Sequence, residues 1–277
     1  MCTTCGCSGG ARPLLTNTAT GKTSRLEVAH IEAPIGVAQR VPRPRAGVRS
    51  TAAPTADLQH LERDLLAHNN TIAARIRDWL RARNILALNL VSSPGAGKTT
   101  LLERTLRHLR DLGDSTAVSV VEGDQETRFD AERIRATGCP SVQVNTGTGC
   151  HLEASMLAGA LEELMPAPGS LLMIENVGNL VCPALFDLGE HAKVAILSVT
   201  EGEDKPLKYP HMFRAASLMI LNKIDLLPYV DFDVETCLGF ARRVNPDIAV
   251  VQVSARTGAG LPDWYAWLQA QQSALPA

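Results

Sequence analysis

The sequence predicts a doubly wound α/β fold with a mostly parallel, seven-stranded sheet. From residue 85 onward, short apolar runs rich in β-branched residues alternate with stretches of helical periodicity, and this alternation is typical of such a sheet. Ligands of these folds bind at the carboxyl ends of the strands, so the residues just after each run are candidate functional residues. The expected strands are residues 85–91, 116–121, 141–144, 170–174, 193–199, 217–221 and 248–253.

The residues before the first strand divide into segments of different composition. Residues 1–10 hold three cysteines and are predicted to be a metal-binding motif. Residues 11–54 are rich in proline and arginine, which predicts a flexible linker; a nucleic-acid-binding arm is disfavoured because no aromatic residue interleaves the arginines. Residues 55–277 should form the globular domain. It should begin with an amphipathic helix, or a broken pair of helices, with apolar positions at Leu58, Leu61, Leu65, Ile72, Ile76 and Leu80.

Composition and charge exclude several classes of protein. The 277 residues are 45% hydrophobic and 20% charged, which suits one globular domain with additional segments. The formal net charge of −2 gives no general attraction to nucleic acid or to anionic membranes. No apolar run approaches the ~18–20 residues that span a bilayer, and the first residues show neither the basic start nor the apolar segment that is typical of a signal sequence. We therefore expect a cytoplasmic protein without nucleic-acid or membrane partners, with its cysteines reduced.

The segment after the first strand has the sequence of a phosphate-binding loop. SSPGAGKTT (residues 92–100) lies between a strand and a helix-forming stretch, which predicts a P-loop NTPase. Lys98 should reach the β- and γ-phosphates and Thr99 should bind magnesium. Ser92 stands where the usual loop begins with glycine, which is tolerable if it can adopt the required backbone geometry. The expected nucleotide-binding residues here are Gly95, Ala96, Gly97, Lys98, Thr99 and Thr100.

Two later segments indicate that the base is guanine. Asn222-Lys223-Ile224-Asp225 follows the sixth strand, and the Asp225 carboxylate can accept from the guanine N1–H and 2-amino groups. Ser254 and Ala255 follow the last strand, in the position of the loop that usually backs the base. Adenine would leave Asp225 unpaired, so the sequence favours GTP over ATP.

Carboxylates at two strand ends are candidates for the magnesium site. Asp124 is the first choice for the carboxylate near magnesium, and Glu175 stands where a typical GTPase has aspartate. Gly178 is placed to give its backbone N–H to the γ-phosphate. We therefore assign Lys98, Asp124, Glu175 and Gly178 to catalysis, and Thr99, Asp124 and Glu175 to magnesium. Glu122 is equally well explained as a surface acid.

Cysteines form two candidate sites for a transition metal. Cys2, Cys5 and Cys7 crowd the N-terminus beside the α-amino group, and together they can wrap one soft or borderline ion. Square-planar N/S ligation suits nickel, and tetrahedral ligation suits zinc. Inside the domain, Cys150 and His151 follow the third strand, and Cys182 follows Gly178 closely. A ligand at Cys182 should move when GTP becomes GDP, which links metal affinity to the nucleotide state.

These motifs together resemble the hydrogenase-maturation nickel GTPases, the HypB family. The resemblance covers residues 1–7 and about 80–265. It implies GTP hydrolysis coupled to nickel insertion into [NiFe]-hydrogenase, with nickel or zinc at Cys150, His151 and Cys182. The motifs that carry it are the terminal CTTCGC, SSPGAGKTT, EGDQET (122–127), GTGCHL (147–152), ENVGNLVCP (175–183), TEGEDKPLKYP (200–210) and NKID (222–225).

The resemblance also implies partners. They are a zinc-containing nickel chaperone of the HypA type, the hydrogenase large-subunit precursor, and a second copy of the chain in a GTP-promoted homodimer. Some members carry a histidine-rich stretch near the N-terminus, and this chain does not, which argues against bulk nickel storage. Lys205 is explained equally well by pairing with an acid of a partner subunit and by solvation.

Two other functions compete with this interpretation. A urease-type nickel GTPase shares the enzymatic core but lacks the Cys2, Cys5 and Cys7 motif, so the cysteines favour the hydrogenase assignment. A non-enzymatic metal sensor or storage protein would require neither Lys98 nor Asp225.

Overall fold

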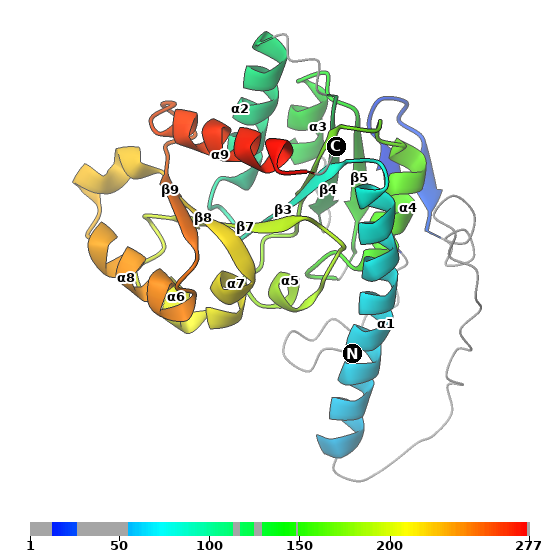
Figure 1. The fold of residues 1–277 in the computed structure, drawn as a ribbon, viewed down its shortest axis with the longest axis horizontal. Coiled ribbons are helices and arrows are strands. Elements are labelled where there is room, and N and C mark those ends of the chain that lie inside the picture. Colours follow the sequence, from blue (N-terminus) through cyan, green and yellow to red (C-terminus); the bar gives the residue numbers. More distant parts are fainter. Residues whose placement is uncertain (1–12, 27–54, 113–116, 125–128, 148, 276–277) are drawn as a thin grey trace.

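The described residues form one nine-stranded sheet covered by helices on both faces (Figure 1). The computed structural model describes residues 13–26, 55–112, 117–124, 129–147 and 149–275. The strands lie in the order β2-β1-β5-β4-β6-β3-β7-β8-β9. Their bounds are β1 Leu14–Asn17, β2 Thr23–Arg25, β3 Leu86–Ser92, β4 Val118–Asp124, β5 Ser141–Asn145, β6 Leu171–Glu175, β7 Ala192–Ser198, β8 Ala216–Asn222 and β9 Ala249–Gln252.

The predicted doubly wound fold is confirmed, because β3 to β9 correspond to the seven expected runs and pair in parallel throughout. Parallel strands covered on both faces are buried on both faces, which explains their continuous apolar sequences. All residues of β3, β6 and β7 are buried. The parallel strands place their carboxyl ends at one edge of the sheet, where the functional motifs follow.

The helices cover the two faces in an alternating pattern. Their bounds are α1 Thr55–Arg81, α2 Lys98–Asp111, α3 Phe129–Arg135, α4 Ala154–Leu164, α5 Cys182–Leu185, α6 Lys205–Lys208, α7 Pro210–Ala215, α8 Val234–Val244 and α9 Leu261–Ser273, with a 3₁₀ helix at Ile224–Tyr229. Leu86, Leu88 and Leu90 of β3 pack with α2, α3 and α9. Ala87 and Val91 face the other side, toward α1 and α4 and toward α7 and α8.

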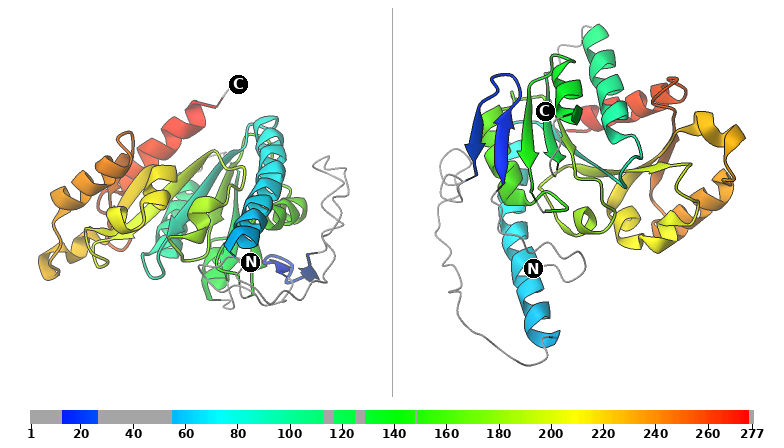
Figure 2. Two further views of the ribbon diagram at one scale, coloured as in Figure 1. Left: turned by 90° about the horizontal axis from the view of Figure 1, so that it is seen from below. Right: turned by 180° about the vertical axis from the view of Figure 1, so that it is seen from behind.

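The linker prediction for residues 11–54 is wrong for residues 14–25, which form an antiparallel hairpin at the edge of the sheet (Figure 2, right). β1 pairs with β5, and the Leu15 side chain is buried against the core. The Asn17 side chain accepts from the backbone N–H groups of Ala19 and Thr20 and so holds the turn. With only one fully buried apolar side chain, the hairpin has little sequence signal of its own. The remainder of the predicted linker lies outside the described residues.

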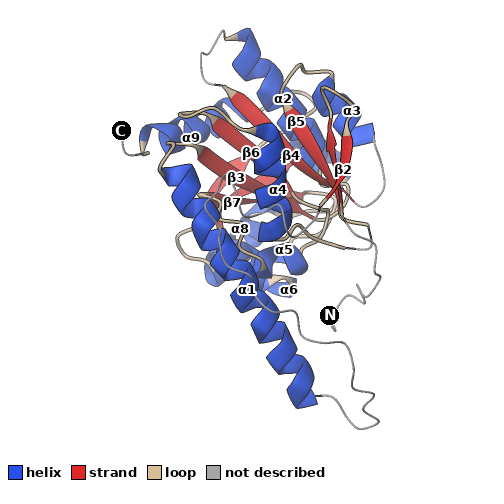
Figure 3. Cartoon of the chain, turned by 90° about the vertical axis from the view of Figure 1, so that its right-hand side faces the viewer, coloured by secondary structure: helices blue, strands red, loops and turns tan. Residues whose placement is uncertain are grey.

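The expected N-terminal helix is one continuous helix, α1, rather than a broken pair. Ile72, Ile76 and Leu80 are buried in the core with α4, as the apolar spacing predicts. Leu65 is 44% exposed, because the N-terminal half of α1 projects past the sheet (Figure 3). Among the helices of the described residues, none combines the length and apolarity that crossing a membrane requires.

Candidate functional site

The phosphate-binding loop joins the end of β3 to the start of α2. Gly95 and Gly97 have φ angles of 75° and 99°, in the region that favours glycine. A Cβ on Gly97 would lie 2.5 Å from Asn222 Nδ2, so a larger residue would displace the loop. Ser92, at the usual glycine position, is the last residue of β3. Its Oγ accepts a hydrogen bond from Lys98 Nζ at 2.9 Å, which shows how serine is accommodated.

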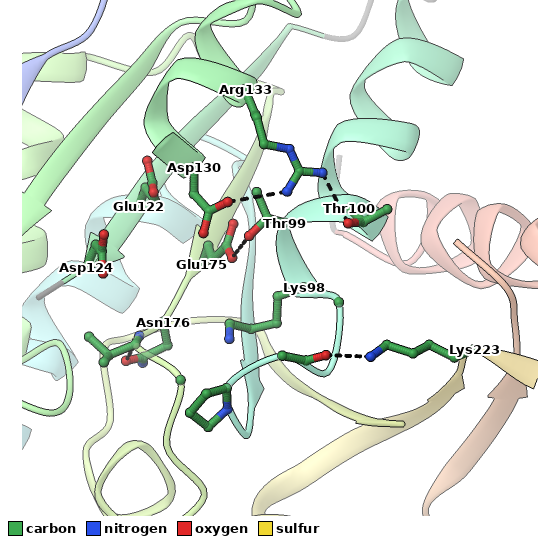
Figure 4. A pocket seen from close by; sticks show the side chains of 16 residues that line it. Lys98, Thr99, Thr100, Glu122, Asp124, Asp130, Arg133, Glu175, Asn176 and Lys223 are labelled. Carbon is green, nitrogen blue, oxygen red and sulfur yellow. Dashed lines mark hydrogen bonds and ion pairs between the residues drawn. The ribbon is translucent and has the colours of Figure 1, made fainter. Parts of the chain in front are cut away.

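The loop forms one wall of a cavity of about 490 Å³ (Figure 4). The cavity is open to solvent and most of its lining is polar or charged, as expected for a nucleotide site at the carboxyl ends of parallel strands. It brings together candidate residues of β4 and β6 and of the segments that follow β3, β6 and β8. The lining residues are Pro94, Gly95, Gly97, Lys98, Thr99, Thr100, Glu122, Gly123, Asp124, Asp130, Arg133, Glu175, Asn176, Val177, Gly178 and Lys223.

Lys98 and Thr99 lie beside Glu175 at the base of the cavity. Burial lowers the pKa of Lys98, and the negative charge of Glu175 opposes that shift. Thr99 Oγ1 donates to Glu175 Oε1 at 2.7 Å. The second carboxylate oxygen of Glu175 is buried and has no hydrogen-bond partner among the described residues. Magnesium prefers oxygen ligands, so the Thr99 hydroxyl and the Glu175 carboxylate are suited to hold it.

Glu122 is a residue of this cavity, and its interpretation as a surface acid is wrong. It is 2% exposed and lies directly opposite Glu175 on the neighbouring strand. Burial, and then the charge of Glu175, raise the pKa of Glu122 to about 9. Glu122 Oε1, like Glu175 Oε2, is buried without a partner in the described part of the chain. Asp124 lines the cavity two residues further along β4. These acids fit a divalent cation.

Asp130 and Arg133 of α3 also line the cavity, and the sequence motifs did not identify them. Arg133 donates to Thr100 Oγ1 at 3.1 Å and forms an ion pair with Asp130 at 3.3 Å (Figure 4). It forms a second ion pair with Glu103 at 2.9 Å. The guanidinium therefore lies beside the phosphate loop. The signal that could have found them is their place just beyond the end of β4, but they match no recognised motif.

The predicted guanine loop is tied to the phosphate loop. Asn222 Nδ2 donates to Ala96 O at 2.8 Å, and Lys223 Nζ donates to Gly95 O at 2.7 Å. Asn222 Oδ1 accepts from Ala255 N at 3.1 Å, which joins the last loop to the same assembly. Asp225 Oδ1 is buried and has no hydrogen-bond partner within the described segments. An acceptor left open in this way is the group that a guanine base would satisfy.

The last strand leads into the Ser254 and Ala255 loop, which is ordered by its own hydrogen bonds. Ser254 is buried, and its Oγ accepts from Thr257 N at 3.0 Å. Arg104 of α2 donates to Ala255 O at 3.1 Å. The structure therefore holds this loop against both the guanine motif and the helix that begins at the phosphate loop.

Gly178 lies against the phosphate loop. A Cβ added there would meet Pro94 Cα at 3.0 Å, so only glycine lets the two segments approach this closely. The same segment continues to Cys182 at the start of α5. One short stretch of chain thus runs from the nucleotide cavity to a cysteine.

Cys182 meets Cys150 and His151 to form a compact cluster. The two Sγ atoms are 3.2 Å apart, Cys150 Sγ is 3.7 Å from His151 Nδ1, and the potential ligand atoms all lie within 4.8 Å of one another. Ligand atoms ~2.0–2.3 Å from one ion can be at most about 4.6 Å apart, so a small contraction would suffice. Burial lowers the pKa of His151 to about 4, which keeps the imidazole neutral and able to ligate.

The remaining cysteines are placed differently. Cys139 and Cys237 are free thiols whose pKa values burial raises to about 12, and both pack in the hydrophobic core clusters. Neither belongs to the cysteine–histidine cluster. Cys2, Cys5 and Cys7 lie outside the described residues.

The TEGEDKPLKYP segment contacts the phosphate loop through Glu201. Ser93 Oγ donates to Glu201, whose other oxygen accepts from Ser198 N at 3.0 Å. Lys205 Nζ lies 4.0 Å from Glu201 Oε2 and 5.2 Å from the centre of the Tyr209 ring. Lys205 therefore has an acidic neighbour in its own chain.

Comparisons with known proteins identify the relatives of this chain. Residues 86–252 match the CobW/HypB/UreG nucleotide-binding domain family. The hydrogenase maturation factor HypB of Azotobacter chroococcum mcd 1 is 61% identical over 214 residues, which cover 77% of this chain and 69% of the relative. The crystal structure of HypB from Archaeoglobus fulgidus is 37% identical with a TM-score of 0.68, covering 74% of this chain and 99% of that one. HypB from Helicobacter pylori in complex with nickel is 37% identical with a TM-score of 0.68, covering 74% and 95%.

Proposed function

The chain belongs to the HypB family of hydrogenase maturation factors, and we propose that it hydrolyses GTP to GDP and phosphate in order to deliver nickel into the large subunit of [NiFe]-hydrogenase. The observation that carries this proposal is the single segment from Glu175 to Cys182. Glu175 and Gly178 line the nucleotide cavity, and Cys182 belongs to the cysteine–histidine cluster. A change at the γ-phosphate therefore reaches a metal ligand through only a few residues.

Each step of phosphoryl transfer has a residue assigned to it. The glycines and backbone of the phosphate loop cradle the phosphates, and Lys98 neutralises charge that develops on them. Gly178 gives its N–H to the γ-phosphate, which the close approach of Pro94 supports. Asn222, Lys223 and Asp225 hold the base, backed by Ser254 and Ala255. Arg133 adds a positive charge beside Thr100 on the same side of the cavity.

Thr99, Asp124 and Glu175 hold magnesium in this proposal. The bound ion supplies charge stabilisation to the phosphates during transfer. What supports the assignment is the set of buried oxygens without partners at Glu175 and Glu122, since buried acids of this kind are normally paired or ligate a metal. Glu122 joins the set as a further carboxylate of the same cavity.

Nickel is the cargo, and two sites hold it. Cys150, His151 and Cys182 form the regulated site, where zinc is the alternative ion. Two thiolates and an imidazole leave a coordination position for a further ligand. The terminal motif of Cys2, Cys5 and Cys7 forms the loading site. The relative from H. pylori was solved in complex with nickel, which supports nickel as the metal.

The partners follow from the same role. We propose that a nickel chaperone of the HypA type loads the protein, that the hydrogenase large-subunit precursor accepts the metal, and that GTP promotes a homodimer. Val181 and Leu185 are 37% and 45% exposed on either side of Cys182. Exposed apolar side chains beside a metal cluster favour contact with a protein at that place. The cytoplasm, where thiols stay reduced, is the compartment that this role requires.

A transfer assay tests the proposed function. The full-length protein, loaded with nickel, is mixed with the hydrogenase large-subunit precursor in the presence of GTP, ATP, a non-hydrolysable GTP analogue, or no nucleotide. We expect nickel to reach the precursor at the highest rate with GTP, because only GTP fits Asp225 and only hydrolysis releases the γ-phosphate. Equal transfer in all four conditions, with no release of phosphate from GTP, would mean that the protein is a passive metal carrier.

A further inference from the structure

Asn176 lines the nucleotide cavity and also hydrogen-bonds to the segment that holds the metal cluster. It is 1% exposed. Its Oδ1 accepts from Val177 N at 2.9 Å and from Leu152 N at 3.1 Å. Val177 precedes Gly178 at the nucleotide cavity, and Leu152 follows His151 of the cluster. One side-chain oxygen therefore ties the phosphate-facing segment to the metal-binding segment.

The other end of Asn176 is fixed by a second buried asparagine. Asn176 Nδ2 donates to Asn89 Oδ1 at 3.2 Å, and Asn89 Nδ2 donates to Glu190 Oε1 at 3.1 Å. Asn89 is fully buried in the middle of β3, between Leu88 and Leu90. Because each amide has its donor and acceptor sides both used, neither asparagine can rotate without breaking a bond at each end.

The path continues from Glu190 back to the cluster. Lys193 pairs with Glu190, and Lys193 Nζ also donates to Phe186 O at 3.1 Å. The Phe186 ring packs on the His151 imidazole with ring centres 3.9 Å apart. The buried polar groups thus reach His151 by this route and Leu152 by the direct hydrogen bond from Asn176.

Asn89 and Asn176 are polar residues at positions where an apolar side chain could also fill the core. A buried amide is costly unless its hydrogen bonds are made, and a fully bonded network admits few alternative arrangements. Closely packed interiors transmit a displacement instead of absorbing it. A shift of the phosphate-facing segment must therefore move Asn176 and, with it, the backbone beside His151.

We propose that Asn176 is a positioning residue through which the nucleotide state sets the geometry of the Cys150, His151 and Cys182 cluster, and that Asn89 holds its amide in place. This inference rests on the proposed function, because it needs both sites to bind their ligands. The hydrogen bonds at Asn176 Oδ1 are the step that couples them.

Nickel binding in two nucleotide states tests the inference. The full chain carries Cys2→Ser, Cys5→Ser and Cys7→Ser, so that nickel reports on the internal cluster. Nickel affinity is measured with a non-hydrolysable GTP analogue and with GDP, and the ratio of the two affinities is the readout. We expect a ratio of at least ~5-fold in this background, and a ratio within about 2-fold of one for both Asn176→Ala and Asn89→Ala.

Asn69 of α1 provides a matched control. It is also a buried asparagine and also holds the metal-binding segment, because Asn69 Oδ1 accepts from Ala154 N at 2.8 Å. Its amide donates to Asp187 O at 2.7 Å, away from the phosphate-facing segment. Asn69→Ala should change nickel affinity equally in both states and leave the ratio intact. By linkage, nickel must change the preference of the protein for the GTP analogue over GDP by the same factor.

The outcomes separate the two proposals. If the nickel-affinity ratio is one in the triple-serine background, with all asparagines intact, the coupling in the proposed function is overturned. The inference is then overturned with it. A ratio that survives both Asn176→Ala and Asn89→Ala overturns the inference alone. Loss of the ratio in Asn69→Ala also overturns it, because packing rather than the shared oxygen would then explain the effect. If Asn176→Ala fails to fold, Asn89→Ala, which lies outside the cavity, decides the question.

Discussion

The nucleotide cavity and the cysteine–histidine cluster lie at the same edge of the sheet but are built in opposite ways. The cavity encloses about 490 Å³, and its buried acids leave oxygens without partners among the described residues. The cluster is closed, with its potential ligand atoms within 4.8 Å of one another. The cavity therefore suits a large, charged ligand that arrives with a cation. The cluster suits a single ion that a small displacement can admit or release.

The difference bears on the proposed control of the cluster by the nucleotide cavity. A ligand that fills the cavity must contact Gly178, where Pro94 already lies close. The cluster tolerates little movement, since a metal ion requires its ligand atoms within a few tenths of an ångström of fixed distances. A small shift caused by a ligand in the nucleotide cavity is therefore enough to change the metal affinity of the cysteine–histidine cluster. Three changes to the protein probe this relation, beginning with the largest expected effect.

Lys98→Ala should have the largest effect, because it should abolish most GTP turnover and leave nickel binding unchanged. Loss of the ammonium at the β- and γ-phosphates should lower kcat/KM for GTP by at least ~10²–10³-fold. Nickel binding by the nucleotide-free protein should not change, because Lys98 contacts Ser92 and lies outside the cluster. Phosphate release and nickel titration measure the two effects.

Lys208→Ala is the control for Lys98→Ala. Lys208 is an exposed lysine whose ion pair is with Asp204, and it does not line the cavity. Its replacement should leave turnover at the wild-type rate. Wild-type turnover in Lys98→Ala would contradict the assignment of the cavity as the hydrolytic site.

Cys182→Ser should have the converse effect. Changes to groups that merely support a metal ligand cost ~10–100-fold in affinity, so loss of a ligand should weaken nickel binding at the internal cluster by at least that factor. The measurement is a nickel titration of the chain with Cys2, Cys5 and Cys7 changed to serine. Cys237→Ser is the matched control, because Cys237 of α8 is as buried as Cys182 and packs in a hydrophobic core cluster. Equal nickel affinity in the two variants would remove Cys182 from the site.

Glu122→Gln should give the smallest effect, seen as a change in the pH dependence of stability. Burial raises the pKa of Glu122 from 4.5 to about 9, so between these values the folded protein holds a proton that the unfolded chain releases. Stability without magnesium and nucleotide should therefore fall as the pH rises from about 5 to 9. Glutamine cannot ionise, so thermal unfolding in a chelator should show the variant more stable than wild type at pH 8.

The advantage of Glu122→Gln should shrink toward pH 5, because the carboxyl of the unfolded wild-type chain then also begins to hold its proton. Glu132→Gln, at an exposed acid of α3, serves as the comparison and should leave the pH profile unchanged. Parallel profiles for wild type and Glu122→Gln would show that the buried carboxyl is already ionised in the folded protein.

Much of the fold could be predicted from local sequence. The parallel strands are buried on both faces and so appear as continuous apolar runs, and each lies close to its expected bounds. The hairpin of β1 and β2 could not be predicted in this way. Its strands are short and largely polar, and β1 is stabilised by pairing with β5, far away in the sequence. These residues have a composition typical of a linker, and they form strands because β1 can pair with β5 at the edge of the sheet.

The candidate site shows the same division. Motifs at the strand ends are enough to identify Lys98, Thr99, Glu175 and the guanine loop. Asp130 and Arg133 match no motif and were missed, because only the packing of α3 beside α2 brings them to the cavity. Asn89 was missed although it interrupts the apolar run of β3. A polar residue inside a strand buried on both faces is itself a signal of a buried hydrogen-bond network.

Local sequence was enough to predict the phosphate loop, the candidate guanine loop and the family, because each depends on neighbouring residues whose local backbone geometry carries the chemistry. The tertiary structure was needed to see that the two candidate sites lie close together. Cys150 follows β5 and Cys182 follows β6, and β4 lies between these strands in the sheet. Their meeting depends on the strand order and on the hydrogen bonds that Asn176 makes to both segments. Such contacts arise from packing between distant parts of the chain, which no local pattern specifies.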